Sequence, residues 1–337
     1  MFATGIGSMP GTDATAYAEA VRQVFDRVPD LPFLPELPGR GVSAGMTGRA
    51  LAMIELGADL QPAGWRLTDA AGVDQRRARS LLAQDLDALE EHAQGFAGGF
   101  KLQVAGPWTL AATVEKPRGD RVLSDFGARR DLAQALAEGV RIHLADVRRR
   151  LPSVTEILVQ VDEPVLPAVL AAQVPTASGF HRHRGVDAPA ASPALEWLTE
   201  AIIDEGGVPI VHCCAPDVPI RLLRGAGFVG LAMDLSLADA AAYDELAEAL
   251  DAGERVILGV VPSMEPKPRP TQKSVIEGVQ RWLDMMGLDP EECGHLMGIS
   301  QTCGLAGATD NWAQTALTLG QRTAAEFAEP ADSTTAR

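Results

Sequence analysis

A histidine, two cysteines and an aspartate stand where short apolar runs end, and their residue types are those of a metal site. The four are His212, Cys214, Asp234 and Cys303. Imidazole nitrogen, thiolate sulfur and carboxylate oxygen are all ligands of Zn²⁺, which prefers four of them in a tetrahedral arrangement. Together they predict a zinc site.

The spacing around the first cysteine decides which side chains share a face. Side chains alternate across a β-strand, so His212 and Cys214 point the same way and Cys213 points into the opposite layer. Each residue taken alone also fits a core role, because free cysteines are often buried and a histidine can be held by hydrogen bonds. Cys293 lies in a polar segment, where a half-exposed thiol without a role is expected.

Short β-branched runs alternate with long amphipathic stretches along the chain, which is typical of parallel strands covered by helices. The predicted strands are Phe2–Ile6, Phe33–Leu37, Lys101–Val104, Ile157–Asp162, Pro209–Cys213, Phe228–Asp234, Arg255–Val260 and Leu296–Ser300. The predicted helices are Asp13–Val28, Gly72–Ala93, Arg129–Arg150, Pro193–Ile203, Val218–Arg224, Ala238–Leu250, Thr271–Met286 and Asn311–Ala325.

Eight such units predict an α/β fold of the (β/α)8 TIM-barrel type, whose chemistry sits at the carboxyl ends of the strands. The predicted ligands fall there, after the fifth, sixth and eighth strands. The Gly- and Pro-containing stretches Gly39–Asp69 and Gly106–Ala128 read as insertions over this end. We expect one catalytic domain over residues 1–328 and a disordered tail over residues 329–337.

The composition limits the classes of partner. The 337 residues carry a formal net charge of −16, which argues against binding of nucleic acid or of an anionic membrane surface. No apolar run is long enough to span a membrane, and the N-terminus lacks a secretion signal. A cytoplasmic protein with reduced thiols is expected.

Several motifs, in a fixed order along nearly the whole chain, resemble the catalytic barrel of cobalamin-independent methionine synthase. They are Thr4-Gly-Ile-Gly7-Ser8-Met-Pro10, Val104-Ala-Gly106-Pro107-Trp-Thr109-Leu110, Val159-Gln-Val-Asp162-Glu163-Pro164, His212-Cys213-Cys214, Asp234-Leu-Ser236 and Cys303-Gly304-Leu305. The chain resembles the short, single-barrel members, because it has no room for the second, N-terminal barrel of the long ones. It also departs from the pattern at Asp234, where the family normally has a glutamate.

The resemblance implies a zinc-dependent methyltransferase that methylates the thiol of homocysteine to give methionine. The backbone at Ile6, Gly7 and Ser8 would hold the substrate carboxylate, and Asp162 with Glu55 its ammonium. Trp108 is a candidate for stacking on a flat donor. The donor would be methyltetrahydrofolate or a methyl-corrinoid protein, and the sequence does not choose between them.

Three other readings fit parts of the pattern. One is methyl transfer to a different thiol. The second is a metal-free lyase like uroporphyrinogen decarboxylase on the same barrel, against which the His-x-Cys spacing argues. In the third, four protein ligands saturate the zinc and the barrel is not catalytic.

Overall fold

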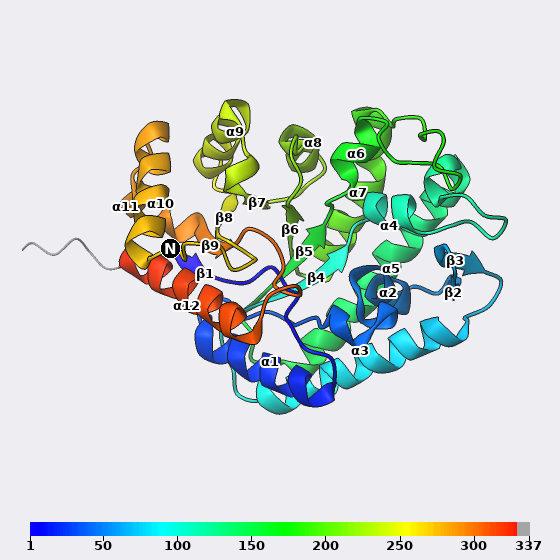
Figure 1. The fold of residues 1–337 in the computed structure, drawn as a ribbon, viewed down its shortest axis with the longest axis horizontal. Helices are drawn as coiled ribbons and strands as arrows, with labels where there is room; N and C mark the ends of the chain where they lie inside the picture. The colour runs from blue at the N-terminus through cyan, green and yellow to red at the C-terminus, as the bar shows by residue number, and fades with distance from the viewer. Residues whose placement is uncertain (329–337) are drawn as a thin grey trace, which may run out of the picture.

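Seven of the apolar runs form one parallel sheet in the computed structural model, which describes residues 1–328 (Figure 1). The strands of this sheet are β1 (Phe2–Ala3), β4 (Gly99–Ala105), β5 (Glu156–Asp162), β6 (Val208–Cys213), β7 (Gly230–Asp234), β8 (Arg255–Val261) and β9 (Met297–Gln301). Their spatial order is β1-β9-β8-β7-β6-β5-β4. The sheet curls into a half-barrel, and the predicted tail over residues 329–337 lies outside the described residues.

The predicted strand Phe33–Leu37 is not a strand of this sheet. It makes isolated bridges to both edges, one pairing Phe33 with Lys101 of β4 and the other pairing Glu36 with Ser8 beyond β1. Pro35 interrupts this segment and Pro32 precedes it, and proline has no N–H to donate to a ladder of hydrogen bonds. The segment therefore lies between the two edge strands without extending either ladder.

The predicted helices are confirmed to within a few residues, and they cover the outer face of the sheet, with α8 and α9 above it and α1 and α12 below it in Figure 1. The long ones are α1 (Ala14–Arg27), α3 (Val73–His92), α5 (Phe126–Arg150), α7 (Ala188–Asp204), α9 (Ala240–Asp251), α10 (Gln272–Met286) and α12 (Asp310–Glu326). The short ones are α2 (Met46–Met53), α4 (Pro107–Thr113), α6 (Leu166–Leu170), α8 (Ile220–Gly225) and α11 (Pro290–Cys293). Side-chain caps such as Asp13 on the Ala16 N–H fix their starts.

Alternation along the strands separates two apolar layers. Outward residues such as Val159 and Val211 pack under the helices in the main core. Inward residues form a second, smaller cluster inside the curl of the sheet, made of Leu31, Leu158, Ile210, Ala232 and Ile257. The next inward positions of β5 and β6, toward the carboxyl ends, are polar. The inner apolar cluster therefore lies directly below the polar residues at the carboxyl ends of β5 and β6.

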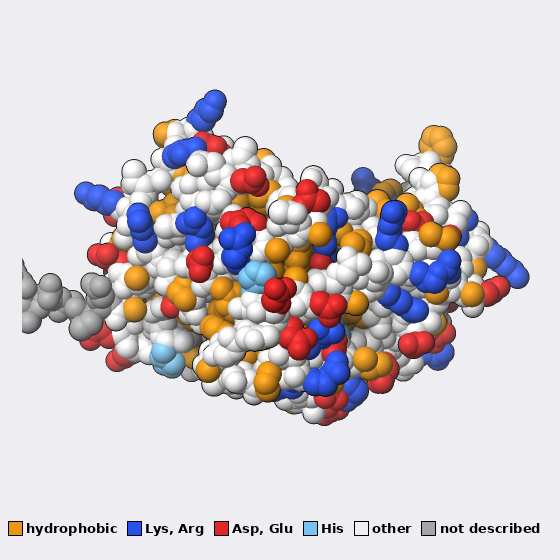
Figure 2. All heavy atoms as spheres, turned by 90° about the horizontal axis from the view of Figure 1, so that it is seen from below, with side chains coloured by type: hydrophobic (Ala, Val, Ile, Leu, Met, Phe, Trp, Pro, Cys, Tyr) orange, Lys and Arg blue, Asp and Glu red, His pale blue; other side chains and the backbone are white. Residues whose placement is uncertain are grey.

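The two predicted insertions have structure of their own. The first contains α2 and an antiparallel hairpin of β2 (Gly57–Gln61) and β3 (Gly64–Thr68), and the second contains α4. Basic and acidic side chains are interspersed on the face of the molecule shown in Figure 2. No helix within residues 1–328 is long and apolar enough to cross a membrane.

Candidate active site

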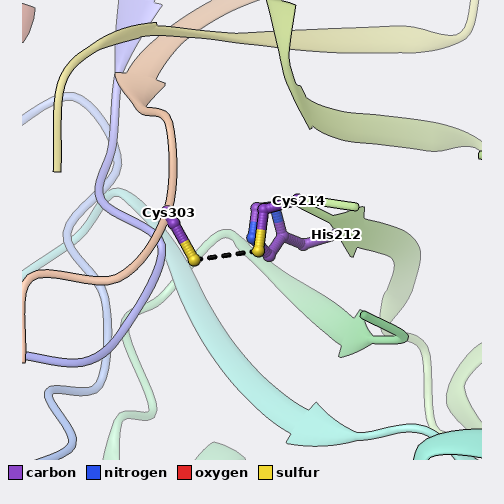
Figure 3. Close-up of side chains that lie close together, drawn as sticks. All are labelled: His212, Cys214 and Cys303. Atoms are coloured by element: carbon purple, nitrogen blue, oxygen red, sulfur yellow. Dashed lines mark hydrogen bonds between the residues drawn. The ribbon is translucent and has the colours of Figure 1, made fainter. Parts of the chain in front are cut away.

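Three of the four predicted metal ligands meet at the carboxyl ends of the strands. His212 and Cys214 come from the end of β6, and Cys303 comes from the loop after β9 (Figure 3). One ligand atom from each lies within 4.8 Å of the other two. The Cys214 and Cys303 sulfurs face each other at 2.9 Å, and both cysteines are free thiols.

The imidazole of His212 is held in the form that a metal ligand needs. Its Nδ1 lies 3.1 Å from the backbone oxygen of Ala232 on the neighbouring strand β7. A proton on Nδ1 makes this hydrogen bond and leaves a lone pair on Nε2. Nε2 is buried and has no hydrogen-bond partner within residues 1–328. A buried, unpartnered nitrogen beside two thiols suits Zn²⁺, so the donor set fits this ion.

The two thiols shift each other's pKa in opposite directions. The hydrogen bond from Cys214 lowers the pKa of Cys303, and the same contact together with burial raises the pKa of Cys214. Deprotonation is therefore easier at Cys303 than at Cys214, and a cation bound between them would balance the thiolate charge.

Asp234, the fourth predicted ligand, lies outside this cluster. It ends β7, and its carboxylate accepts hydrogen bonds from the backbone N–H of Ser236 at 2.9 Å and from the Ser236 hydroxyl at 2.6 Å. It thereby caps the short 3-10 helix Leu235–Leu237. The structure thus assembles three ligands, and direct ligation by Asp234 stays a prediction. Cys213 is buried and does not belong to the cluster, as the alternation of the strand requires.

The predicted carboxylate-binding segment lies beside the metal cluster. The Leu305 N–H donates to the Ser8 carbonyl at 2.8 Å, and a Cβ added to Gly304 would lie 2.0 Å from the Ser8 hydroxyl oxygen. Ser8 therefore abuts the residue that follows the ligand Cys303. The backbone N–H groups of Gly7 and Ser8 donate to no protein acceptor within residues 1–328. Such N–H groups are rare in a protein interior, and they suit an anionic ligand.

Asp162 lies at the end of β5 and is 8% exposed. Its carboxylate accepts a hydrogen bond from Gln160 Nε2 at 2.7 Å. Burial raises the pKa of Asp162 to about 7, and the nearby carboxylate of Glu36 adds to this, while His212 opposes it. Asp162 is thus a buried carboxylate without a salt bridge within the described residues.

Comparison with known proteins identifies the fold and the family. The family model described as "Cobalamin-independent synthase, Catalytic domain" matches residues 108–326, more than half of the 337 residues. The chain belongs to the cobalamin-independent methionine synthase family. The reaction of this family is methyl transfer to homocysteine, and its members generally depend on zinc. No match was found among curated proteins.

One solved structure supports this fold, and another is reported with it. A B12-independent methionine synthase from Shewanella sp. W3-18-1, in complex with selenomethionine, is 12% identical with a TM-score of 0.63, and the match covers 96% of each chain. A GH5_18 protein from Streptomyces cattleya is 14% identical with a TM-score of 0.48, covering 98% of this chain and 81% of that one.

A glutamate other than the predicted Glu55 lies near Asp162. Glu55 is exposed in the bend between α2 and β2, so its role in substrate binding stays a prediction. Glu36 is 5% exposed, and its carboxylate lies 3.0 Å from Gln103 Nε2 and 3.1 Å from Arg49 Nε. A single acidic residue ending the apolar run Phe33-Leu-Pro-Glu36 is the signal that could have pointed to it.

Trp108 is buried in the first turn of α4. The indole is 3% exposed and donates from Nε1 to the Ala191 carbonyl at 3.0 Å. Glu163, the residue after Asp162, accepts hydrogen bonds from the N–H groups of Trp108 and Thr109 and so holds the start of α4. Stacking of Trp108 on a methyl donor would require uncovering this ring, and it stays a prediction.

Proposed function

We propose that this protein is a zinc-dependent methyltransferase that moves a methyl group to the thiol of homocysteine and gives methionine. The observation that carries this proposal is the proximity of two features. One is the cluster of His212, Cys214 and Cys303, and the other is the pair of Gly7 and Ser8 N–H groups, which have no protein acceptor within residues 1–328. The cluster offers a place for the sulfur of an amino acid, and the amides beside it offer a place for its carboxylate.

His212, Cys214 and Cys303 would hold the zinc ion. Zinc supplies the deprotonation of a thiol that binds to it, and a thiolate is the nucleophile in methyl transfer. Three protein ligands leave a fourth position for an incoming thiol, as catalytic zinc sites require. Asp234 would then lie near the zinc ion without occupying its fourth ligand position.

The remaining residues place the amino acid. The N–H groups of Gly7 and Ser8 would donate to the substrate carboxylate, and Asp162 would accept from its ammonium. Glu36 is the second carboxylate in this proposal, in place of Glu55, because its charge acts on Asp162. With the thiol, the carboxylate and the ammonium all held, the sulfur has one orientation toward the methyl donor.

The finer features follow the family resemblance. We propose that the segment Phe33–Leu37 completes a (β/α)8 barrel through its bridges to both edges of the sheet, that residues 1–328 form one catalytic domain, and that the protein works in the cytoplasm. The methyl donor is methyltetrahydrofolate or a methyl-corrinoid.

Zinc content and methyl transfer test the proposal together. We expect about one zinc per chain by elemental analysis, and methionine formation from homocysteine with methyltetrahydrofolate or methylcobalamin as donor. Cys303→Ala should lose most of the metal, because it removes one of three ligands. Cys213→Ala is the matched control and should keep the metal, since its side chain faces the opposite layer.

The same measurements separate the other readings. A protein without zinc that still folds would favour the decarboxylase-like chemistry. A zinc protein whose X-ray absorption spectrum gains no additional sulfur ligand when homocysteine is added would be a structural zinc barrel. Methylation of another thiol in place of homocysteine would move the proposal to a different acceptor.

A further inference from the structure

The interior below the site contains a fully buried lysine. Lys101 of β4 is 0% exposed and projects into the curl of the sheet, where its Nζ donates to the Ile6 carbonyl at 3.0 Å and to Gln160 Oε1 at 2.9 Å. Gln160 Nε2 donates to the same Ile6 carbonyl at 2.8 Å and to Asp162. Two donors from two strands therefore hold one backbone oxygen.

A buried lysine is unusual, because removing its charge from water is costly. Burial lowers the pKa of Lys101 to about 7, and the attraction of Asp162 and then of Glu36 opposes this. The lysine thus lies among acidic groups of the proposed site, although it has no place among the proposed zinc ligands or substrate contacts.

The geometry of the peptide bond connects Lys101 to the substrate. In a trans peptide the C=O and the following N–H point in opposite directions. The Ile6 carbonyl points toward Lys101 and Gln160, so the Gly7 N–H of the same peptide points away from them. This N–H, like that of Ser8, has no protein acceptor within residues 1–328. A charged donor on the carbonyl also strengthens the N–H at the other end of the peptide, because linked hydrogen bonds polarise one another.

We propose that Lys101 is a positioning residue for the substrate carboxylate, which, with Gln160, fixes the Ile6–Gly7 peptide so that the Gly7 N–H faces the bound amino acid. This inference rests on the proposed function, since it assumes that an amino acid binds there. Lys101 itself does not touch the substrate. Its effect is specific to the carboxylate end of the ligand.

Two ligands of the zinc-loaded protein test this role. They are homocysteine and 3-aminopropane-1-thiol, which is homocysteine without its carboxylate. Lys101→Met keeps an unbranched side chain and removes the donor, and it should weaken homocysteine roughly ten- to a hundredfold in calorimetric titrations. It should leave the affinity for 3-aminopropane-1-thiol within about twofold. In turnover, the KM for homocysteine should rise more than kcat falls.

Two further variants complete the test. Gln160→Met removes the second donor to the Ile6 carbonyl and also the hydrogen bond to Asp162, so it should weaken both ligands but homocysteine more than 3-aminopropane-1-thiol, and it decides the question if Lys101→Met does not fold. Lys273→Met changes an exposed lysine of α10 and should change neither affinity.

The outcomes are distinct. Equal losses for both ligands, or no loss for either, in Lys101→Met or Gln160→Met would overturn the positioning role. If the unaltered, zinc-loaded protein binds neither ligand, the proposed function fails and this inference fails with it.

Discussion

Glu36 is a buried carboxylate that two side chains hold in place. Arg49 and Gln103 contact it, and Arg49 also bonds to Asp85 at 2.6 Å, which Arg40 contacts in turn. This buried chain of alternating charges fixes the position of Glu36 without neutralising the nearby Asp162. Glu36 is paired with Arg49, whereas Asp162 has no salt bridge within the described residues, so an ammonium group beside Asp162 would be stabilised.

Glu36→Gln should therefore weaken homocysteine binding, because it removes a charged partner of the substrate ammonium. A charged hydrogen bond contributes roughly 1.5 to 3 kcal/mol, so the affinity should fall about ten- to over a hundredfold. Glu55→Gln is the matched control, and we expect it to bind homocysteine like the unaltered protein. Titration calorimetry at constant zinc content measures both. A loss in Glu55→Gln with none in Glu36→Gln would return the role to Glu55.

The sequence predicts part of the His212, Cys214 and Cys303 cluster because the signal for it is local. His212 and Cys214 are two positions apart on one strand, and the alternation of side chains puts both on one face. Glu36 and Lys101 carry no such local signal. Lys101 interrupts the apolar run Phe100-Lys101-Leu102, and its partners Ile6 and Gln160 are 95 and 59 positions away. Contacts of this kind exist only after the sheet has curled.

At the scale of elements, helix boundaries follow from local chemistry. Asp13, Asp125, Asp187 and Thr271 each accept a hydrogen bond from a backbone N–H of the first turn that follows, and the predicted helices start at most six residues from them. The predicted strand Phe33–Leu37 makes only isolated bridges, because Pro35 has no N–H to donate and because periodicity does not specify which strands lie beside the segment. Trp108 is likewise placed by α7, which supplies the carbonyl for its indole N–H.

Strand pairing beside the metal ligands depends on Gly259. It pairs with Asp234 of β7 and Ser300 of β9, and a Cβ added there would lie 2.6 Å from the Met233 carbonyl oxygen and 3.1 Å from that of Gln301. Backbone atoms cannot rotate away, so Gly259→Ala should destabilise the fold by about 1 to 3 kcal/mol. It should also lower zinc content, because β9 leads directly to Cys303.

Gly225→Ala is the control for this change. Gly225 ends α8, and an added Cβ would have no atom within 4 Å. Its free energy of unfolding should be unchanged or slightly higher, since alanine favours helix over glycine. Denaturant unfolding with elemental analysis compares the two variants, and equal stability in both would show that the strands at Gly259 can separate without cost.

At the scale of the whole molecule, acid stability should depend on one buried histidine. His143 lies on α5, is almost fully buried, and its Nε2 has no hydrogen-bond partner within residues 1–328. Burial lowers its pKa to about 4, and the charges of Arg49 and Arg150 add to this. The folded protein therefore excludes a proton that the unfolded chain accepts near pH 6.5.

The sign of the effect follows from proton binding. Because the unfolded chain binds the proton more tightly, the contribution of His143 to stability is fully present above pH 6.5 and is lost as the pH falls toward 4. The loss is at most about 1.4 kcal/mol for each pH unit in that window. His143→Gln should flatten the fall in the free energy of unfolding between pH 6.5 and 4, whatever its stability at pH 7. His295→Gln, at an exposed site, should keep the slope of the unaltered protein. Urea unfolding at several pH values measures the slopes, and identical slopes in His143→Gln and the unaltered protein would show that water or a proton reaches His143 in the folded state.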